Sequence, residues 1–373
     1  MEAHIETLRS SPLFQLSLTS KELFHSNFLA WLFEMYRKES GQALSRFLKD
    51  GTDNVAIEGV LREHNHHDLT ISFKNGQELI IENKVKSLPY IEQLAMYSED
   101  AKANQNFLLL SLVPPPFARE GKIQTGSVVW STLTYSDLAA IIEQIGSSIK
   151  NEYHRAMLSD YAAFIASLGS IFASDAYDEN ELFADFHSPS EGSLFEKLRP
   201  LRMGDIYQKL RYESFAGHIR EALMQKYSGP VSLSGSHIED GQVGHTYIIH
   251  GFTHTTGLVS VSYVLAKGLY LTVQIQGDSY RQMVQGYAGY GSASRAVAEG
   301  LKEKHLWFDF SNFAAAKEYP RGAKVFNTYT SVDYYRSVKL APAFTVKDVI
   351  GFVVLDMERI EKSNKQITAV VHE

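Results

Sequence analysis

The chain of 373 residues contains no cysteine. Disulfide bonds, cysteine-based zinc sites and thiol nucleophiles are therefore excluded. The sequence has no apolar run of the roughly 20 residues that cross a bilayer. Its first residues do not show the basic segment and apolar stretch of a secretory signal. We therefore expect a cytoplasmic protein that has no membrane partner.

Several catalytic signatures are absent as well. The sequence has no glycine-rich phosphate loop of the G-x-x-x-x-G-K-[ST] type, which argues against ATP hydrolysis, and no G-x-S-x-G or H-E-x-x-H pattern. The chain has 36 Lys and Arg residues and 43 Asp and Glu residues, which give a formal net charge of −7. This balance argues against a large, non-specific basic surface, so any contact with nucleic acid should be local and partly mediated by metal ions.

The composition is that of a globular protein, with 44% hydrophobic and 21% charged residues. A length of 373 residues exceeds one ordinary core, so we expect two domains. The boundary is predicted at Ala173–Glu191, which holds six acidic residues and no Lys or Arg. We therefore expect a first domain over residues 1–172, an acidic linker or mobile lid over 173–192, and a second domain over 193–373.

Helical and strand-like patterns alternate in the first domain. A long helix is predicted from about Ser20 to Phe47, because apolar residues recur at helical spacing after Thr19-Ser20-Lys21-Glu22, which resembles a capping box; a break is expected near Gly41. We then expect strands at Val55–Glu63, His67–Phe73 and Glu78–Lys84, a helix at Tyr90–Lys102, strands at Asn106–Val113 and Val128–Ser131, a helix ending near Ile145, and a helix at Asn151–Phe172. A helix after the third strand requires a crossover connection, so the fold class is α/β with a mixed sheet flanked by helices.

The second domain is predicted to be α+β. We expect a helix at Asp205–Tyr227, strands at Val231–Ile238, His245–Phe252, Gly257–Ala266 and Leu269–Ile275, a loop-rich stretch at Gly277–Tyr290, a helix at Ser292–Lys304, strand-like pieces at Lys324–Thr330 and Tyr334–Leu340, and a helix at Val346–Ser363.

The third predicted strand carries an acid and an amine on one face. Glu82 and Lys84 are two residues apart, so their side chains leave the strand in the same direction, roughly 6–7 Å apart at the backbone. Both sit in an apolar run, where a lone charge costs several kcal/mol, so charged or polar partners must lie nearby.

The position of Asp68 depends on the loop that joins the second and third strands. A two-residue Asn75-Gly76 turn pairs Asp68 with Asn83 and places the carboxylate on the wrong face. A three-residue loop that ends at Gly76 pairs Asp68 with Glu82, and the two carboxylates then converge beside Lys84. The sequence is compatible with both registers.

Two carboxylates and an amine fit the chemistry of phosphodiester hydrolysis. Carboxylate oxygens are the ligands that Mg²⁺ or Mn²⁺ prefers, and Mg²⁺ usually takes one or two of them together with water and phosphate oxygens. Such an ion lowers the pKa of a bound water and neutralises charge on the phosphate. Lys84 is suited to hold that water or to stabilise the transition state, and the direction in which its pKa shifts is left open by the sequence.

This stretch resembles the PD-(D/E)XK nuclease superfamily, also called restriction-endonuclease-like. The resemblance covers about residues 15–150 and aligns Asp68 with the metal-binding Asp, Glu82 with the second acid and Lys84 with the Lys of the motif. His67 stands where the family has Pro. In one branch the helix after the motif carries Gln and Tyr four residues apart, which Gln93 and Tyr97 match.

The resemblance implies further roles for these residues. Glu22, an acid early in the first helix, is implied as a third metal-binding or catalytic group beside Asp68 and Glu82, and Gln93 and Tyr97 as further active-site residues. The implied activity is Mg²⁺- or Mn²⁺-dependent hydrolysis of double- or single-stranded DNA, in phage defence, repair or mobile-element biology, and many superfamily members are homodimers.

The same residues also have non-catalytic interpretations. Asp68, Glu82 and Lys84 would suit a structural ion pair, Glu22 a capping box, and Gln93 and Tyr97 the polar margin of an amphipathic helix. The alternative function is therefore a non-catalytic nuclease-like scaffold whose C-terminal domain binds a protein or nucleic acid. A third possible function is that of a metal-dependent hydrolase that acts on another phosphate ester.

Other polar clusters carry weaker signals. Three histidines, His64, His66 and His67, lack a fourth zinc ligand and are interpreted as a solvated loop cluster; His245, His250 and His254 are interpreted as ordinary strand and turn residues. The aromatic stretch Gly286–Arg295, together with Tyr280, Arg281, Tyr334, Tyr335 and Arg336, would suit stacking on unpaired bases, but a tyrosine-rich core edge is the favoured interpretation.

Overall fold

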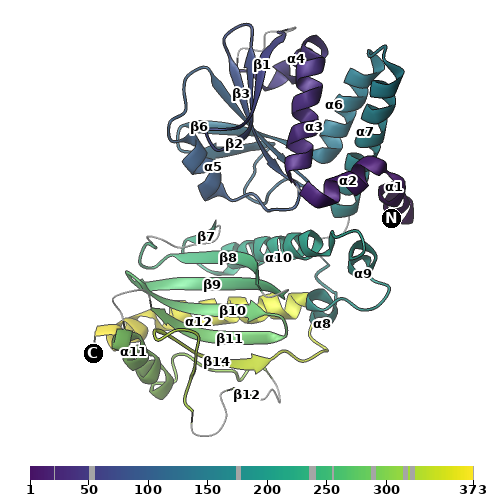
Figure 1. Ribbon diagram of the computed structural model, residues 1–373. Helices are drawn as coiled ribbons and strands as arrows, with labels where there is room; N and C mark the ends of the chain where they lie inside the picture. Colours follow the sequence, from purple (N-terminus) through teal and green to yellow (C-terminus); the bar gives the residue numbers. More distant parts are fainter. Residues whose placement is uncertain are drawn as a thin grey trace. The chain divides into compact units, whose positions relative to one another are not determined.

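The computed structural model describes residues 1–20, 22–49, 55–173, 178–234, 241–253, 256–286, 291–313, 318–319 and 324–372. The chain forms two compact units (Figure 1). Unit 1 comprises Met1–Ala176 and Lys197–Tyr207, and unit 2 comprises Tyr177–Glu196 and Gln208–Glu373.

Unit 1 is built on a six-stranded mixed sheet in the order β1-β2-β3-β4-β6-β5. The strands are β1 (Ile57–His64), β2 (His67–Phe73), β3 (Glu78–Lys84), β4 (Gln105–Ser111), β5 (Lys122–Thr125) and β6 (Val128–Thr134). β1, β2 and β3 form an antiparallel meander, whereas β4 is parallel to β3 and β6 is parallel to β4. A parallel neighbour needs a crossover, which a helix between β3 and β4 provides. The predicted mixed α/β fold is thereby confirmed.

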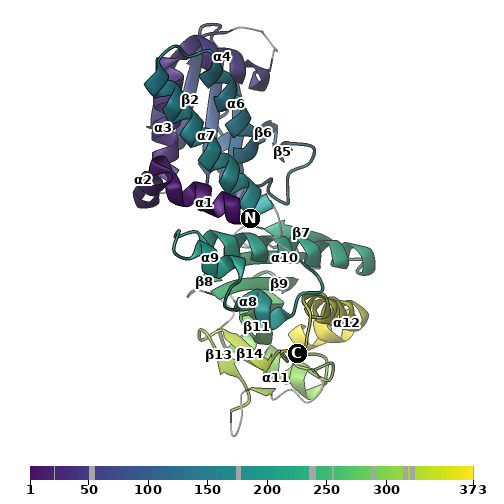
Figure 2. The same ribbon diagram turned by 90° about the vertical axis from the view of Figure 1, so that its right-hand side faces the viewer.

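Helices cover both faces of this sheet. They are α1 (Glu2–Ser10), α2 (Pro12–Ser20), α3 (Glu22–Met35), α4 (Arg37–Leu44), the 3-10 helix η1 (Ser45–Phe47), α5 (Ile91–Ser98), α6 (Tyr135–Ser147) and α7 (Glu152–Ala173). Figures 1 and 2 show α3, α6 and α7 together on one face, and Figure 1 shows α5 on the other. The α5 face has its own cluster of buried residues, which includes Ile80, Leu94, Phe107 and Trp130.

The predicted bounds of the long helix at Ser20–Phe47 are wrong. The structure breaks it at Tyr36, not near Gly41, and adds α1 and α2 before it. Gly41 lies inside α4, where a Cβ would stand 2.2 Å from the carbonyl oxygen of Val55. A glycine is therefore required at this position because the backbone at Val55 approaches it closely, and not because the helix ends there. The edge strand β5 was also missed.

The helix α7 is long and apolar enough to cross a membrane by length and composition alone, unlike the sequence-based expectation. However, 56% of the relevant window is buried inside the protein. Tyr161, Phe164 and Ile165 are fully buried in unit 1. Packing in the core thus accounts for its apolar character.

Unit 2 is a sheet with helices on one face. Its strands are β7 (Val231–Ser234), β8 (Thr246–Thr253), β9 (Thr256–Ala266), β10 (Leu269–Gln276), β11 (Ser279–Gly286), β12 (Glu318–Tyr319), β13 (Asn327–Thr328) and β14 (Asp333–Lys339). Its helices are α8 (Phe183–His187), α11 (Gly291–Glu303), α12 (Val346–His372) and the part of α10 (Gly204–Lys226) that follows Tyr207. The division of the sequence between the two units also falls within α9 (Leu194–Leu198). Alternate residues of the strands join α8, α10, α11 and α12 in one hydrophobic core.

Three expectations for this region are corrected. The stretch predicted as a loop at Gly277–Tyr290 contains β11, a full partner of β10 and β14. The predicted acidic linker contains α8, and Phe183 and Phe186 of this helix are buried in the core of unit 2, so this part of the segment belongs to unit 2 and is not a linker. The last helix extends to His372 because Ile367 and Val370 are buried in the same core. Residues 235–238 of the first predicted strand lie outside the described residues.

Candidate active site

The β2–β3 hairpin takes the three-residue register. Leu69 pairs with Ile81 and Ser72 with Glu78, so Asp68 lies opposite Glu82. The amide of Phe73 donates to the carbonyl oxygen of Gln77 at 2.9 Å. Gly76 has a φ of +81°, the left-handed conformation that closes such a loop. Of the two registers that the sequence allowed, the structure has the one that brings the carboxylates to the same face.

Glu82 and Lys84 form a buried ion pair. The Nζ atom of Lys84 lies 2.8 Å from Oε1 of Glu82, and the two side chains are 12% and 4% exposed. Both point to the same side of the sheet as Ile80, which packs against Leu94 of α5. This confirms that the acid and the amine share a face, and it gives Glu82 one of the partners that its burial requires.

Asp68 is half-buried and held by the backbone of the neighbouring strand. Its Oδ2 accepts a hydrogen bond from the amide of Asn83 at 2.7 Å. Burial raises the pKa of Asp68, although the Asn83 amide and the Lys84 ammonium oppose this rise. Glu22 and Glu63 add to the rise, which shows that several carboxylates act on one another here.

Burial and the neighbouring charges shift the pKa values of both members of the ion pair. Burial raises the pKa of Glu82 to about 7, with Asp68 adding to the rise and Lys84 opposing it. Burial lowers the pKa of Lys84, but Glu82, Glu22 and Asp68 more than offset this effect, so that the pKa of Lys84 lies above its ordinary value. The direction that the sequence left open is therefore upward, and Lys84 carries a full positive charge.

Glu22 has a role that the capping-box interpretation does not describe. Its Oε1 accepts hydrogen bonds from the amides of Val85, Lys86 and Ser87 at 3.3, 3.1 and 2.9 Å, and from the Ser87 hydroxyl at 2.6 Å. Glu22 therefore holds the loop that follows β3. Of the proposed box, Thr19 and Ser20 belong to α2, and Lys21 lies outside the described residues.

Asn83 anchors the strand between the two charged residues, and the sequence analysis did not identify it. Its side chain points to the opposite face, where it accepts a hydrogen bond from the Tyr135 hydroxyl and donates to Ser26 Oγ at 3.1 Å and to the Glu22 carbonyl oxygen at 3.4 Å. Asn83 is 1% exposed. A polar residue in the inward-facing series Leu79, Ile81, Asn83 was the signal available in the sequence.

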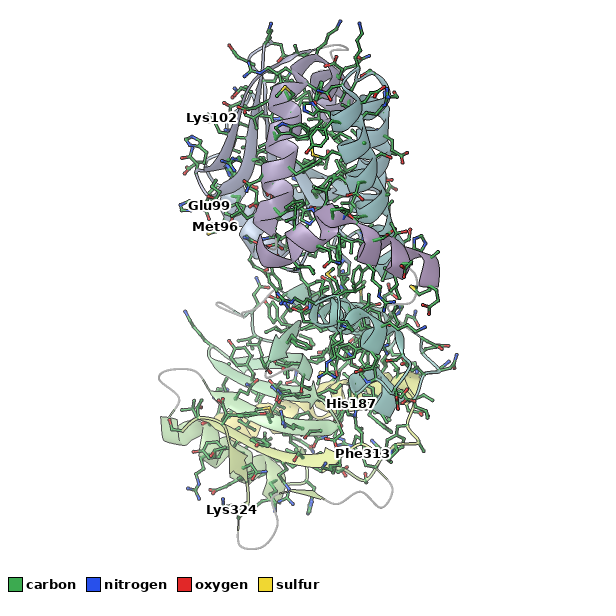
Figure 3. The ribbon with its side chains drawn as sticks, turned by 45° about the vertical axis from the view of Figure 1, so that its right-hand side comes forward. Met96, Glu99, Lys102, His187, Phe313 and Lys324 are labelled. Atoms are coloured by element: carbon green, nitrogen blue, oxygen red, sulfur yellow. The ribbon has the colours of Figure 1, made fainter. Side chains whose placement is uncertain are left out.

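Gln93 and Tyr97 lie together on α5. Gln93 Nε2 donates to the Tyr97 hydroxyl at 2.9 Å. The Tyr97 ring packs edge-on against His67, the residue before Asp68, at 5.6 Å between centroids. The helix thus presents both residues near the first residues of β2. Its outward surface carries Met96, and Glu99 lies just beyond its end (Figure 3).

The histidine clusters show no metal geometry. Among the described residues, no group of three or more His, Asp or Glu side chains could hold a metal ion by itself. His64 and His66 are exposed and His67 is half-buried. His250 is buried beside Glu213, and His254 lies outside the described residues.

The Tyr and Arg residues of unit 2 divide between the core and the surface. Tyr280 is fully buried and donates to Asp356 at 2.7 Å, and Tyr334 packs against the core. Arg281 instead lies 5.3 and 5.6 Å from the ring centroids of Tyr329 and Tyr335. Residues 287–290 of the aromatic stretch lie outside the described residues.

Asp68 and Glu82 nevertheless fit a divalent cation as a pair. Together with Glu22 they place three carboxylates around one ammonium group, and burial together with mutual repulsion raises the pKa of both Asp68 and Glu82. A cation between two such groups removes this penalty. Two carboxylates suffice for Mg²⁺, which keeps waters and phosphate oxygens as its other ligands.

A comparison with protein families matches the segment of the chain that contains these residues. Residues 13–163 match the family model described as the PD-(D/E)XK nuclease superfamily. This part of the chain belongs to the PD-(D/E)XK nuclease superfamily. Membership indicates a nuclease, a hydrolase that acts on nucleic acid, and nucleases of this superfamily generally use divalent metal ions. No curated protein and no solved structure matches the chain.

The matched segment of the PD-(D/E)XK nuclease domain runs from α2 into α7 and includes Glu22, Asp68, Glu82, Lys84 and Tyr97. The resemblance noted from the sequence is thereby confirmed at the level of the superfamily. The branch with a Gln/Tyr helix stays a prediction.

Proposed function

We propose that unit 1 hydrolyses DNA phosphodiester bonds in a reaction that depends on Mg²⁺ or Mn²⁺. The observation that carries the proposal is the register of the hairpin, which places Asp68 opposite Glu82 with the Lys84 ammonium 2.8 Å from Glu82. An ion pair that served stability alone would not need the further acid, because Asp68 raises the pKa of Glu82 and so weakens the pair.

In this proposal Asp68 and Glu82 hold the ion. A divalent cation bound there supplies an activated water and neutralises charge on the scissile phosphate. The Asn83 amide orients the Asp68 carboxylate, since its hydrogen bond occupies Oδ2. Lys84 is protonated and stabilises the negative charge that develops on the phosphate.

The remaining candidate residues have supporting roles. Glu22 adds negative charge to the cluster and fixes the loop Val85–Ser87 through Oε1, so that any contact with the ion involves its other oxygen or a water. Gln93 and Tyr97 lie on α5 beside the first residues of β2 and are proposed to contact the substrate.

Cleavage assays test this function directly. The full chain is incubated with Mg²⁺ or Mn²⁺ and with linear, circular and single-stranded DNA, with RNA as a separate arm. We expect metal-dependent cleavage of DNA that falls at least a hundredfold in Lys84→Ala and Asp68→Asn. The exposed Lys74→Ala serves as the matched control, because it removes one lysine from the loop of the same hairpin.

The outcomes separate the alternatives. Cleavage of circular DNA identifies an endonuclease, and cleavage of RNA alone replaces the DNA assignment. Equal activity in Lys84→Ala and in the wild type rejects the proposed site. Folded protein without cleavage of any substrate favours the non-catalytic scaffold. A cytoplasmic location, a homodimer and a role in phage defence, repair or mobile-element biology are further parts of the proposal.

A further inference from the structure

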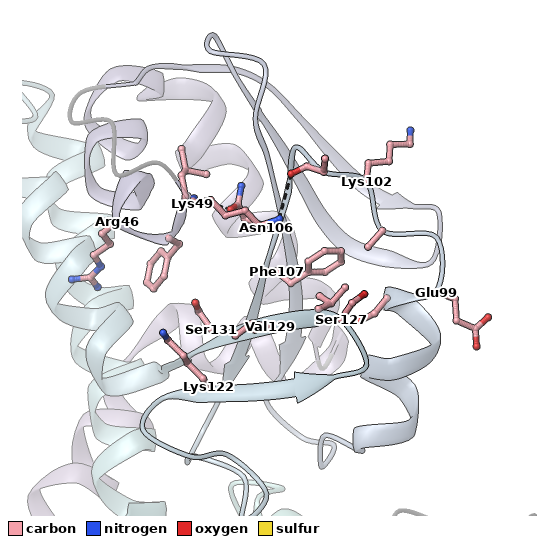
Figure 4. Close-up of a pocket in the computed structure, with 16 residues that line it drawn as sticks. Arg46, Lys49, Glu99, Lys102, Asn106, Phe107, Lys122, Ser127, Val129 and Ser131 are labelled. Carbon is pink, nitrogen blue, oxygen red and sulfur yellow. Dashed lines mark hydrogen bonds between the residues drawn. The ribbon is translucent and has the colours of Figure 1, made fainter.

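Unit 1 contains a cavity away from the candidate active site. It has a volume of about 720 Å³ and lies where β4 and β6 begin, between the sheet and η1 (Figure 4). Asn106 at its floor pairs with Leu79, five residues before Lys84. At 3.3 Å per residue the two sites are roughly 16 Å apart along the strand. We call this cavity the basic pocket, lined among others by Arg46, Lys49 and Lys122.

The basic pocket has an excess of positive charge in an acidic chain. Its lining includes the side chains of Arg46, Lys49, Lys102 and Lys122 but only one carboxylate, that of Glu99. Figure 4 shows Arg46 and Lys122 flanking one side of the cavity, whereas Glu99 extends away from it on the other side. No carboxylate of the described residues lies within 4.0 Å of the Arg46 or Lys122 charge. This end of the cavity is therefore suited to an anion.

The fold holds the backbone that carries Lys49 and Lys122. The backbone amide of Lys49 donates to Asn106 Oδ1 at 2.9 Å, and Asn106, 4% exposed, donates in turn to the carbonyl oxygen of Glu78 at 3.1 Å. On β5, Ile123 is buried in the cluster beneath α5, so its neighbour Lys122 must point to the other face. A site whose backbone is fixed in advance loses less entropy when it binds a ligand.

The same cavity also exposes apolar surface. Val129 on β6 is 46% exposed although it belongs to a strand, and Phe47 of η1 is half-buried. The Arg46 guanidinium lies 5.0 Å from the centroid of the Phe47 ring. Ser131, opposite Lys122 in the sheet, adds a hydroxyl group. Cations at one end and apolar groups beside them match a ligand that joins a phosphate to a flat, partly apolar body.

We propose that the basic pocket binds a nucleotide, with its phosphate on Arg46 and Lys122 and its base against Phe47 and Val129. The volume lies within the roughly 300–1,000 Å³ of small-molecule sites. The same phosphate chemistry is supplied by a free mononucleotide or by the 5′-phosphorylated end of a nucleic acid strand. This site does not depend on the proposed hydrolysis, because it shares no residue with the Asp68–Lys84 cluster.

Binding is measured by titration calorimetry on the full chain in EDTA, so that neither the metal nor cleavage affects the result. The probes are AMP, adenosine, inorganic phosphate, and a single-stranded DNA of about ten nucleotides with and without a 5′ phosphate. We expect one AMP per chain and at least tenfold weaker binding of adenosine and of inorganic phosphate. Tighter binding of the 5′-phosphorylated DNA than of AMP identifies a strand end as the ligand, and the reverse order identifies a free nucleotide.

Two sets of variants locate the ligand. Arg46→Gln combined with Lys122→Gln should weaken AMP binding at least tenfold, whereas Lys38→Gln combined with Lys74→Gln, which removes the same charge from exposed positions elsewhere in unit 1, should leave it unchanged. Val129→Asp adds a negative charge inside the cavity at an exposed position and should have the same effect as the first pair. All variants should retain the thermal unfolding temperature of the wild type within a few degrees.

The inference is overturned if AMP fails to bind the wild type and the 5′-phosphorylated DNA binds no more tightly than the unphosphorylated DNA. It is also overturned if the ligand that binds the wild type binds the Arg46/Lys122 double variant equally well. Equal affinity for AMP and for inorganic phosphate overturns the assignment of a nucleotide. Loss of DNA cleavage with unchanged AMP binding would instead concern the proposed hydrolysis alone.

Discussion

Substitution of Lys84 by methionine should destabilise the metal-free protein by an amount that grows with pH. The reason lies in Glu82, which is 4% exposed and whose Oε1 lies 2.8 Å from the Lys84 ammonium. Methionine fills similar space but removes the charge that keeps Glu82 ionised. Without that charge the pKa of Glu82 rises above its wild-type value of about 7.

The magnitude follows from linkage between protonation and folding. Glu82 has an ordinary pKa of 4.5 and a pKa of about 7 in the folded wild type. The folded state therefore binds the proton more tightly, and the free energy of unfolding falls by about 3 kcal/mol as pH rises from 4.5 to 7. Above pH 7 this loss stops in the wild type. In Lys84→Met it continues until the higher pKa is reached, which adds about 2–3 kcal/mol by pH 9.

Urea unfolding in EDTA at pH 6 and pH 9 measures this difference. At each pH the free energy of unfolding of Lys84→Met is subtracted from that of the wild type. We expect this difference to be larger at pH 9 than at pH 6 by at least about 2 kcal/mol. Lys74→Met is the control, because Lys74 is exposed in the hairpin loop and its replacement should cost the same at both pH values. A difference between Lys84→Met and wild type that does not change with pH would refute the reasoning.

Three further substitutions have expected effects on stability. Gly41→Ala should destabilise by about 1–3 kcal/mol, because the new Cβ would stand 2.2 Å from a backbone oxygen, whereas Gly59→Ala meets no atom within 4 Å and should be tolerated; thermal unfolding distinguishes them. Tyr135→Phe removes the hydroxyl that donates to Asn83 and should cost about 1–3 kcal/mol in urea unfolding. Burial raises the pKa of Glu213 to about 8, so the wild type should lose about 4–5 kcal/mol of unfolding free energy as pH rises from 4.5 to 8. Glu213→Gln has no group to titrate there and should abolish this loss. An unchanged pH profile of stability would contradict this.

The strands of the candidate site could be predicted from sequence, but their register could not. The bounds of β2 and β3 agree with the alternation of apolar and polar residues around Asp68 and Glu82. The loop sequence Asn75-Gly76 suits either a two-residue or a three-residue connection. The choice depends on the left-handed φ of Gly76 and on the hydrogen bond between Phe73 and Gln77, which periodicity does not reveal.

Residues with distant partners were the ones whose contacts local sequence patterns did not reveal. Glu22 fits a local capping pattern, yet its carboxylate binds a loop more than 60 residues away in sequence. The strand β11 lies in a stretch that was expected to be rich in loops. In the structure Gln282 is fully buried and donates to Asp356 at 2.7 Å and to the Asp309 carbonyl at 3.1 Å. A buried polar residue on a strand is stable only with such partners, and these are set by tertiary structure.

The central claim is that Asp68 and Glu82 share one divalent cation, and Mn²⁺ binding to the full chain tests it most directly. Electron paramagnetic resonance of free Mn²⁺ counts the ions bound to the wild type, to Asp68→Asn, to Glu82→Gln and to the exposed control Glu99→Gln. We expect one ion per chain in the wild type and in Glu99→Gln, and at least tenfold weaker binding in the other two variants. Mn²⁺ binding of equal strength in all four proteins would contradict the claim.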